Sequence, residues 1–244
     1  YKKRIILNAG NSGTLGRLIL GLLVHSKNKI KLKGDQSLSR RDFSRVIVPL
    51  KKFGVDFSSN NGKLPIDIFG TSFPKPIKYY EKKGSAQCKS AVMFAALNTS
   101  GTTVIKAKKS RDHSELLFKF LKLPIKISKK KNYDLIKING KKKIKPLNYN
   151  IPSDISSSAF FIVLTALSNN SKLKIKNVNI NPTRVGILKI LKAMGVHIKV
   201  KNVKTYNGEK IADLFIKSHK TFKPINCPTR LNSAAIDEFL LIFL

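Results

Sequence analysis

The sequence predicts an α/β fold, of mixed α+β character, in which helices and strands alternate within repeated βαβαββ units. Small polar residues open an apolar helix at three places that lie about 70 residues apart. A strand, a loop that contains arginine and a second amphipathic helix follow each opening. This repetition mixes helices and strands in every unit instead of segregating them along the chain.

The first helix of each unit begins where short polar side chains precede an apolar run. Such residues are preferred N-caps, and the N–H groups of a helix's first turn favour an anion. The three openings are residues 11–14, 85–87 and 153–158. Residues 10–14 are interpreted as an anion cradle, with an ordinary N-cap as the alternative. The cradle has neither the Gly-Lys-Ser/Thr of a P-loop nor the pattern G-x-G-x-x-G.

The elements that follow repeat in the same order. Lysine alternates with isoleucine or leucine along residues 29–33 and 172–176, which is typical of a strand with one solvated face. The loop arginines are Arg40, Arg41, Arg111 and Arg184. Second helices are predicted through residues 46–53, 116–121 and 187–194, and Asn-Gly pairs at 61–62, 139–140 and 207–208 predict hairpin or loop turns. If equivalent loops converge, they form a site for a small ligand with several anionic groups.

The composition indicates a folded, strongly basic chain. Its 244 residues are 42% hydrophobic, and 48 Lys+Arg against 13 Asp+Glu give a formal charge of +35. This charge favours polyanions or small anionic substrates, so a basic nucleic-acid-binding protein stays an alternative. Against it, the lysines are spread along the whole chain, aromatic content is 8% without Trp, and no recognised nucleic-acid-binding motif is present.

Cys88 and Cys227 indicate neither a disulfide framework nor a metal site, because no CxxC pair or histidine cluster accompanies them. No cofactor is expected. The apolar runs are too short to span a bilayer and no signal sequence opens the chain, so we expect a cytoplasmic protein with no membrane partner. The chain begins at Tyr1 and stops inside an apolar stretch, and we expect an internal fragment truncated at both ends.

An ordered set of motifs resembles the 5-enolpyruvylshikimate-3-phosphate synthase family along essentially the whole chain. These motifs are GNSGT with Arg17, GDQSL with Arg41, SAQ with Lys89, SRDHSE at 110–115, Asp154 with Ser156 and Ser157, NPTR at 181–184, and IDE at 236–238. The resemblance implies transfer of the enolpyruvyl group from phosphoenolpyruvate to the 5-hydroxyl of shikimate 3-phosphate, with release of phosphate. It implies a transferase without cofactor or nucleic acid, and a monomer for the full-length protein.

The resemblance also implies a two-domain enolpyruvyl transferase architecture, an inside-out α/β barrel whose second domain is incomplete here. Most of the first domain would occupy residues 1–150 and part of the second residues 151–244, with a hinge near 148–154.

The resemblance implies site residues only where the motifs match. Those for shikimate 3-phosphate are Ser85, the Ala86 backbone, Gln87, Ser110, Arg111 and Asp237, with Asp237 as the proton acceptor near the 5-hydroxyl. Those for phosphoenolpyruvate are the Gly13 backbone, Arg41 and Gln87. The roles of Arg17, Lys89 and Arg184 stay open, and His113 is interpreted as structural.

Departures from the family pattern limit what the resemblance implies. Asp42 stands where the family usually has proline, and this charge either weakens the anion clamp or points outward. The family's Lys-Ser and Lys-Glu-Ser-Asp-Arg motifs are absent, so we expect no turnover from residues 1–244 alone. Gly13 implies sensitivity of the intact enzyme to glyphosate. The related transferase acting on UDP-N-acetylglucosamine is the other enzyme alternative, but neither cysteine lies in its motif.

Overall fold

The computed structural model describes residues 4–140, 144, 146–219 and 221–244. Internal contacts divide the chain into unit 1, residues 1–110 and 121–145, and unit 2, residues 111–120 and 146–244. The segment 111–120 therefore groups with the later part of the chain, whereas the sequence analysis placed it in the first domain. The domain division at residue 150 and the hinge stay predictions, and each unit is described by itself.

The first repeat of unit 1 has the predicted βαβαββ order. Its elements are β1 (Arg4–Asn8), α1 (Gly13–Leu22), β2 (Lys29–Lys33), the short α2 (Gln36–Ser39), α3 (Ser44–Lys51), β3 (Asp56–Asn60) and β4 (Lys63–Phe69). The sheet has the order β1-β2-β4-β3, in which β1 and β2 are parallel and the remaining pairs antiparallel. A short 3-10 helix, Leu23–His25, follows α1.

The second repeat has the same topology. Its elements are β5 (Lys78–Glu81), α4 (Ala86–Leu97), β6 (Thr102–Lys108), α5 (His113–Phe120), β7 (Ile125–Lys129) and β8 (Tyr133–Asn139). The sheet order is β5-β6-β8-β7, again with one parallel pair and two antiparallel pairs. Helix α5 belongs to unit 2 although its neighbours in sequence belong to unit 1.

The third repeat lies in unit 2, and its first strand is reduced to one residue. Its elements are α6 (Ile155–Leu167), β9 (Lys172–Asn179), α7 (Gly186–Ala193), β10 (His197–Tyr206) and β11 (Glu209–Lys217), in a sheet of order β10-β11-β9. Ser153 forms an isolated parallel bridge with Val178 where β1 and β5 form full strands. A 3-10 turn (Thr229–Leu231), α8 (Asn232–Ala235) and α9 (Phe239–Ile242) follow. The predicted mixed α/β class with repeated βαβαββ units is confirmed.

The three Asn-Gly pairs lie where the sequence predicts hairpin or loop turns: two form hairpin turns, and the third marks the end of a strand. Both residues of 61–62 and of 207–208 have positive φ, as a tight hairpin turn requires. Asn139 instead ends β8, and the β7–β8 hairpin turns at residues 130–132. Gly140 serves close packing, because a Cβ there would lie 2.0 Å from the Thr99 carbonyl oxygen at the end of α4. Glycine is required both in a tight turn and where two backbone segments approach closely. An Asn-Gly pair in the sequence therefore does not distinguish the two cases.

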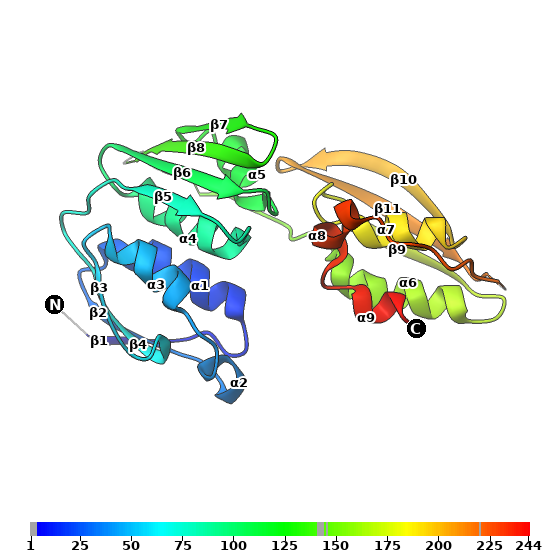
Figure 1. Cartoon of the computed structure of the whole chain (residues 1–244), viewed down its shortest axis with the longest axis horizontal. Coiled ribbons are helices and arrows are strands. Elements are labelled where there is room, and N and C mark those ends of the chain that lie inside the picture. Colours follow the sequence, from blue (N-terminus) through cyan, green and yellow to red (C-terminus); the bar gives the residue numbers. More distant parts are fainter. Residues whose placement is uncertain (1–3, 141–143, 145, 220) are drawn as a thin grey trace. The chain divides into compact units, whose positions relative to one another are not determined.

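The core of unit 1 lies between its two sheets, where helices α1, α3 and α4 pack together (Figure 1). Helices α1 and α4 approach so closely that a Cβ on Gly21 would lie 2.1 Å from the Ala91 carbonyl oxygen. Small residues at such a crossing let two helix backbones approach each other. The contact joins the first two repeats through their first helices.

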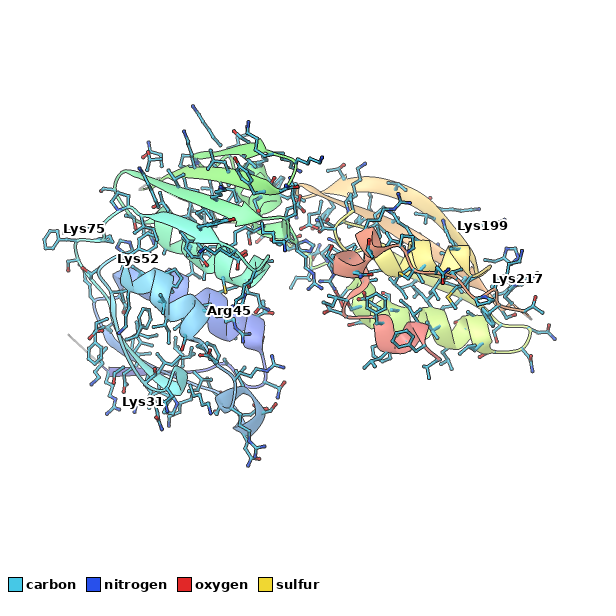
Figure 2. All side chains as sticks on the ribbon, viewed as in Figure 1. Lys31, Arg45, Lys52, Lys75, Lys199 and Lys217 are labelled. Atoms are coloured by element: carbon cyan, nitrogen blue, oxygen red, sulfur yellow. The ribbon has the colours of Figure 1, made fainter. Side chains whose placement is uncertain are left out.

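In unit 2, helices α6 and α7 cover one face of the β10-β11-β9 sheet. The core includes Ile162, Ile187, Val178 and Leu214, all buried. Lys199 and Lys217 project from β10 and β11 and are exposed, as the lysine alternation predicts for a solvated sheet face (Figure 2). Helix α6 also carries exposed apolar side chains: Phe160, Phe161, Leu164 and Leu167.

Within the described residues, none of the helices combines the length and the apolar character that crossing a bilayer requires.

Asp213 stabilises irregular backbone in unit 2. Its carboxylate accepts from the Asn177 N–H at 3.0 Å and from Asn202 Nδ2 at 2.9 Å, and it lies 3.3 Å from Lys174 Nζ. Asn177 and Asn202 have positive φ, and the strand register shifts beside Asp213. The hydrogen bond from Asn202, followed by the one from Asn177 and the charge of Lys174, lowers the pKa of Asp213 to about 2.

We expect Asp213→Asn to lower the melting temperature at neutral pH. A carboxylate whose folded-state pKa is depressed adds stability above its unfolded pKa, and that stability is lost as the pH falls through the folded pKa. The deficit should therefore be full above about pH 4 and shrink toward pH 2. Thermal unfolding across this range measures it, with the exposed Asp56→Asn as control; a deficit independent of pH contradicts the assignment.

Gly21→Ala is expected to destabilise unit 1 by about 1–3 kcal/mol or more, because the new methyl would overlap the backbone of α4. Denaturant unfolding measures this loss. Gly16→Ala is the matched control, since its methyl would lie 3.1 Å from the Phe43 ring, a side chain that can yield. Equal losses for the two variants would show that the α1–α4 approach is not the constraint.

Candidate functional site

The start of α1 is held by local hydrogen bonds in the conformation that the sequence predicts. Gly10 has a φ of +54° and its N–H donates to Asn8 Oδ1 at 2.9 Å. Ser12 is the N-cap, and its hydroxyl accepts from the Leu15 N–H at 3.1 Å. Asn11 Nδ2 donates to Asp35 at 2.5 Å. Residues 10–14 therefore begin a capped helix, as the N-cap alternative predicts, and the interpretation as an anion cradle stays a prediction.

Two guanidinium groups converge on Gly13. A Cβ at this position would lie 2.9 Å from Nη1 of both Arg17 and Arg41. Arg17 donates to the Gly13 carbonyl at 3.3 Å and to Gln87 Oε1 at 3.0 Å, and its guanidinium lies 5.1 Å from the centroid of the Phe43 ring. The structure thus brings together three of the predicted residues: Gly13, Arg41 and Gln87.

The electrostatics of this cluster favour an anion. Burial, and next the like charge of Arg41, lower the pKa of Arg17. Two neighbouring cations repel each other, and an anion between them relieves that repulsion. The first-turn N–H groups of α1 face the same region and add the positive end of the helix dipole. The cluster can therefore hold a phosphate or carboxylate group.

The start of α4 is fixed by a buried carboxylate. Glu81, at the end of β5, is 3% exposed and accepts from the backbone N–H of Ser85 at 2.9 Å. The Ser85 hydroxyl caps α4 by accepting from Cys88 N at 3.2 Å, and Ala86 is the first helical residue. Gln87 Nε2 donates to the Thr14 hydroxyl at 2.8 Å, which joins the beginnings of α4 and α1.

Asp42 supports the start of α3. Its carboxylate accepts from the Ser44 N–H at 2.7 Å, and hydrogen bonds from the Ser44 side chain and backbone lower the pKa of Asp42. Asp42 contributes only weakly to the pKa of Arg17, where burial and Arg41 have larger effects. The negative charge at this position therefore serves a helix terminus and does not cancel the arginine pair.

Two further residues from the motifs belong to unit 1 and have buried groups. The Ser110 hydroxyl oxygen is buried and has no hydrogen-bond partner within the described part of the chain. Lys89 is 1% exposed, which is unusual for lysine, and lies on the buried face of α4.

The remaining two predicted residues, Arg111 and Asp237, form an ion pair in unit 2. Arg184 joins them, because its Nη2 lies 3.9 Å from Asp237 Oδ2 and 3.3 Å from Asp154 Oδ1. Asp154 caps α6 by accepting from the Ser157 N–H at 2.8 Å. This arrangement places a carboxylate between two guanidinium groups beside a helix start.

A hollow of about 220 Å³ opens beside this cluster, and Asp154 and Arg184 both line it. His113 also lines it, and its Nδ1 lies 2.7 Å from Oε1 of the buried Glu209. Asn179 donates to the other oxygen of Glu209. The interpretation of His113 as structural stays a prediction, supported by this contact.

A larger basic hollow lies on the outer face of the β10-β11-β9 sheet and contains none of the predicted residues. Its charged and aromatic lining residues are Lys172, Lys174, His197, Lys199, Phe215 and Lys217. Alternating lysines on a solvated strand face account for it. Among the described residues, no group of three or more His, Cys, Asp or Glu side chains could hold a metal ion.

No role was assigned from the sequence to two arginines and two acidic residues that the structure places within the two clusters. Arg17 lies four residues after Gly13, so the helical spacing that places both on one face was available as a signal. Arg184 was recognised in its motif without a role. Glu81 lies in none of the motifs, and Glu238 appears in the IDE motif without a role. The burial of both residues gave no local signal, because it depends on packing between distant segments.

Comparison with known proteins agrees with this geometry. The family model described as EPSP synthase (3-phosphoshikimate 1-carboxyvinyltransferase) matches residues 1–240. The chain belongs to the EPSP synthase family. The 3-phosphoshikimate 1-carboxyvinyltransferase of Ruthia magnifica subsp. Calyptogena magnifica is 42% identical over 239 residues, which cover 98% of this chain and 54% of that protein. The 3-phosphoshikimate 1-carboxyvinyltransferase of Legionella pneumophila (strain Corby) is 40% identical over 240 residues, which cover 98% of this chain and 54% of that protein.

Solved structures give the same result. The EPSP synthase from Acinetobacter baumannii superposes with a TM-score of 0.82 at 37% identity, covering 96% of this chain and 52% of that chain. The enolpyruvyl transferase NikO from Streptomyces tendae superposes with a TM-score of 0.58 at 16% identity, covering 77% of this chain and 44% of that chain. This likeness shows the fold alone. The predicted enolpyruvyl transferase fold is confirmed, and the chain spans about half the length of the EPSP synthases it matches.

Proposed function

We propose that this chain supplies substrate-binding and proton-accepting groups to an EPSP synthase that transfers enolpyruvyl from phosphoenolpyruvate to shikimate 3-phosphate. In the net reaction the 5-oxygen of shikimate 3-phosphate bonds to the enolpyruvyl carbon, the bond from that carbon to the phosphate oxygen breaks, and the hydroxyl proton leaves. The convergence of Arg17 and Arg41 on Gly13 carries the proposal, because it forms a site for an anionic group at a helix start.

The proposed roles divide between the two units. In unit 1, Arg41 and the Gly13 backbone hold the phosphate of phosphoenolpyruvate, with Gln87 beside them. Ser85, the Ala86 backbone, Gln87, Ser110 and Arg111 hold shikimate 3-phosphate. Asp237 accepts the proton of the 5-hydroxyl, a role that requires hydrogen-bond reach to that oxygen. Its exposed carboxylate and its pairing with Arg111 support this assignment.

Other properties of the protein follow from the same proposal. The reaction involves no cofactor, metal, nucleic acid or membrane, and the full-length protein is a monomer in the cytoplasm. Two domains meet near residues 148–154. The names of the relatives support this enzyme over the UDP-N-acetylglucosamine transferase, and the spread of lysines over solvated strand faces argues against nucleic-acid binding.

The direct test is enolpyruvyl transfer by the longest protein that the gene encodes, with phosphate release as the readout. Residues 1–244 alone should bind without turnover, because the family's Lys-Glu-Ser-Asp-Arg motif is not in this sequence. Absence of transfer by the longer protein, together with salt-sensitive binding to random DNA, would favour the nucleic-acid alternative.

Arg111→Ala is expected to weaken the binding of shikimate 3-phosphate. A charge-assisted hydrogen bond contributes about 1.5–3 kcal/mol, which corresponds to a Kd raised on the order of 10- to 100-fold. Calorimetric titration of the longer protein measures it. Arg230→Ala, which removes an exposed arginine from the same unit, is the matched control and should bind normally. An unchanged affinity in Arg111→Ala removes this residue from the site.

Glyphosate is expected to inhibit the intact enzyme, and Gly13→Ala should reduce that inhibition. The new methyl would lie 2.9 Å from the terminal nitrogens of Arg17 and Arg41, so both must shift from the positions that hold the anion. The inhibitor concentration that halves the rate measures the effect, with Leu22→Ala at the exposed far end of α1 as control. The expectation is contradicted if the wild-type enzyme keeps its full activity at glyphosate concentrations that fully inhibit a sensitive relative.

A further inference from the structure

Asp237 and Glu238 are neighbours in sequence but lie in opposite environments. The side chain of Asp237 is 46% exposed, whereas Glu238 is 1% exposed. Glu238 Oε1 accepts a hydrogen bond from the Ser156 hydroxyl, and Oε2 is buried without a partner among the described residues. A buried carboxyl is costly unless its surroundings satisfy it. A partly satisfied one next to the proposed proton acceptor therefore points to a function.

Ser156 joins Glu238 to Arg184. A serine hydroxyl has one proton to donate and two lone pairs that accept. The Ser156 oxygen accepts from Arg184 Nη2 at 2.5 Å, and its proton is donated to Glu238 Oε1. One hydroxyl thus fixes a guanidinium group on one side and a carboxyl group on the other.

Arg184 continues the chain of contacts to Asp237. Its side chain is 14% exposed, and its Nε is buried with no partner within the described residues. Nη2 contacts Ser156 and Asp154 and lies 3.9 Å from Asp237 Oδ2. Ser156 and Asp154 therefore hold, through Nη2, the guanidinium charge that faces Asp237.

We propose that Glu238 is a positioning residue for Asp237, acting through Ser156 and Arg184 to set the proton affinity of that carboxylate. The proposal rests on the proposed function for the reaction that Asp237 serves. The contacts that carry it all lie within unit 2, so it can be tested on this chain without turnover.

The charges around Glu238 give the direction of the effect. Arg184 faces it from the β9–α7 connection, Arg111 from the segment before α5, and Asp237 from the same turn, while Ser156 of α6 contributes a neutral hydroxyl. Burial raises the pKa of Glu238 against the opposing effects of Ser156 and Arg184, and the neighbouring charge of Asp237 raises it further. Two neighbouring carboxylates repel each other when both are ionised, so removal of the Glu238 charge favours the charged form of its neighbour.

Glu238→Gln keeps the size of the side chain and removes its charge, so Asp237 should release its proton more readily. It should also fold. A carboxyl group whose folded-state pKa is raised gives stability below its unfolded pKa and loses it as the pH rises through the folded pKa, and a neutral amide avoids that loss. Ser156→Ala is a second variant with the same expected direction, because Arg184 loses an acceptor and acts more strongly on Asp237.

The first measurement is a carboxyl-carbon NMR titration of residues 1–244, with the Asp237 signal assigned by its loss in Asp237→Asn. We expect the Asp237 signal to titrate at lower pH in Glu238→Gln than in the wild type. Glu209→Gln is the matched control. It alters another buried carboxyl of unit 2, whose partners are His113 and Asn179, and should leave Asp237 unchanged. An unchanged Asp237 in both folded variants, Glu238→Gln and Ser156→Ala, overturns the proposal.

The second measurement is the pH profile of kcat/KM for the longer protein. Its acidic limb should move to lower pH in Glu238→Gln by the same amount as in the titration, whereas a merely structural role lowers the rate without moving the limb. If the protein transfers enolpyruvyl but the acidic limb does not move in Glu238→Gln, the positioning role is overturned and the proposed function stands. Absence of transfer in the wild type contradicts the proposed function, and the NMR titration then decides the positioning role.

Discussion

The candidate site of unit 1 depends on the close approach of two helix backbones. Gly21 and Ala91 let α1 and α4 run side by side, and the same alignment brings Thr14 and Arg17 against Gln87 near the helix starts. The paired positions are separated by about the same number of residues at both places, as expected when equivalent helices of successive repeats lie parallel. Without this approach, two capped helices would remain, but their polar starts would not share a ligand.

Each unit combines arginines with carboxylates in a different way. In unit 1 the nearby carboxylates accept hydrogen bonds from backbone N–H groups, Glu81 from Ser85 and Asp42 from Ser44 at the start of α3. The positive charge of the arginines near Gly13 is therefore not neutralised by these acids. In unit 2 Asp237 lies between Arg111 and Arg184 and is itself a chemical participant in the proposed reaction. One arrangement suits binding of an anion, and the other holds a carboxylate in place by ion pairs.

Local signals predicted most of the fold. The helix starts at Ser12, Ser85 and Asp154 were predictable because capping involves only the next few residues. The close packing at Gly140 could not be predicted from the sequence, because it comes from Thr99, about forty residues earlier. The contact of Arg17 with Gln87 spans seventy residues, and motif recognition supplied both residues without their pairing. The burial of Glu238 depends on α6 and could not be derived from its own neighbourhood.

The reduction of the third repeat's first strand to a single bridge leaves β9 as an edge strand. Ser153 pairs with Val178 near one end, and β11 covers the other side of β9. An open strand edge is a template onto which a second chain can add, and natural proteins often block such addition with lysine. Lys172, Lys174 and Lys176 are exposed along this strand. Their charge therefore protects the protein against edge-to-edge aggregation, a benefit of the basic composition that is independent of any ligand.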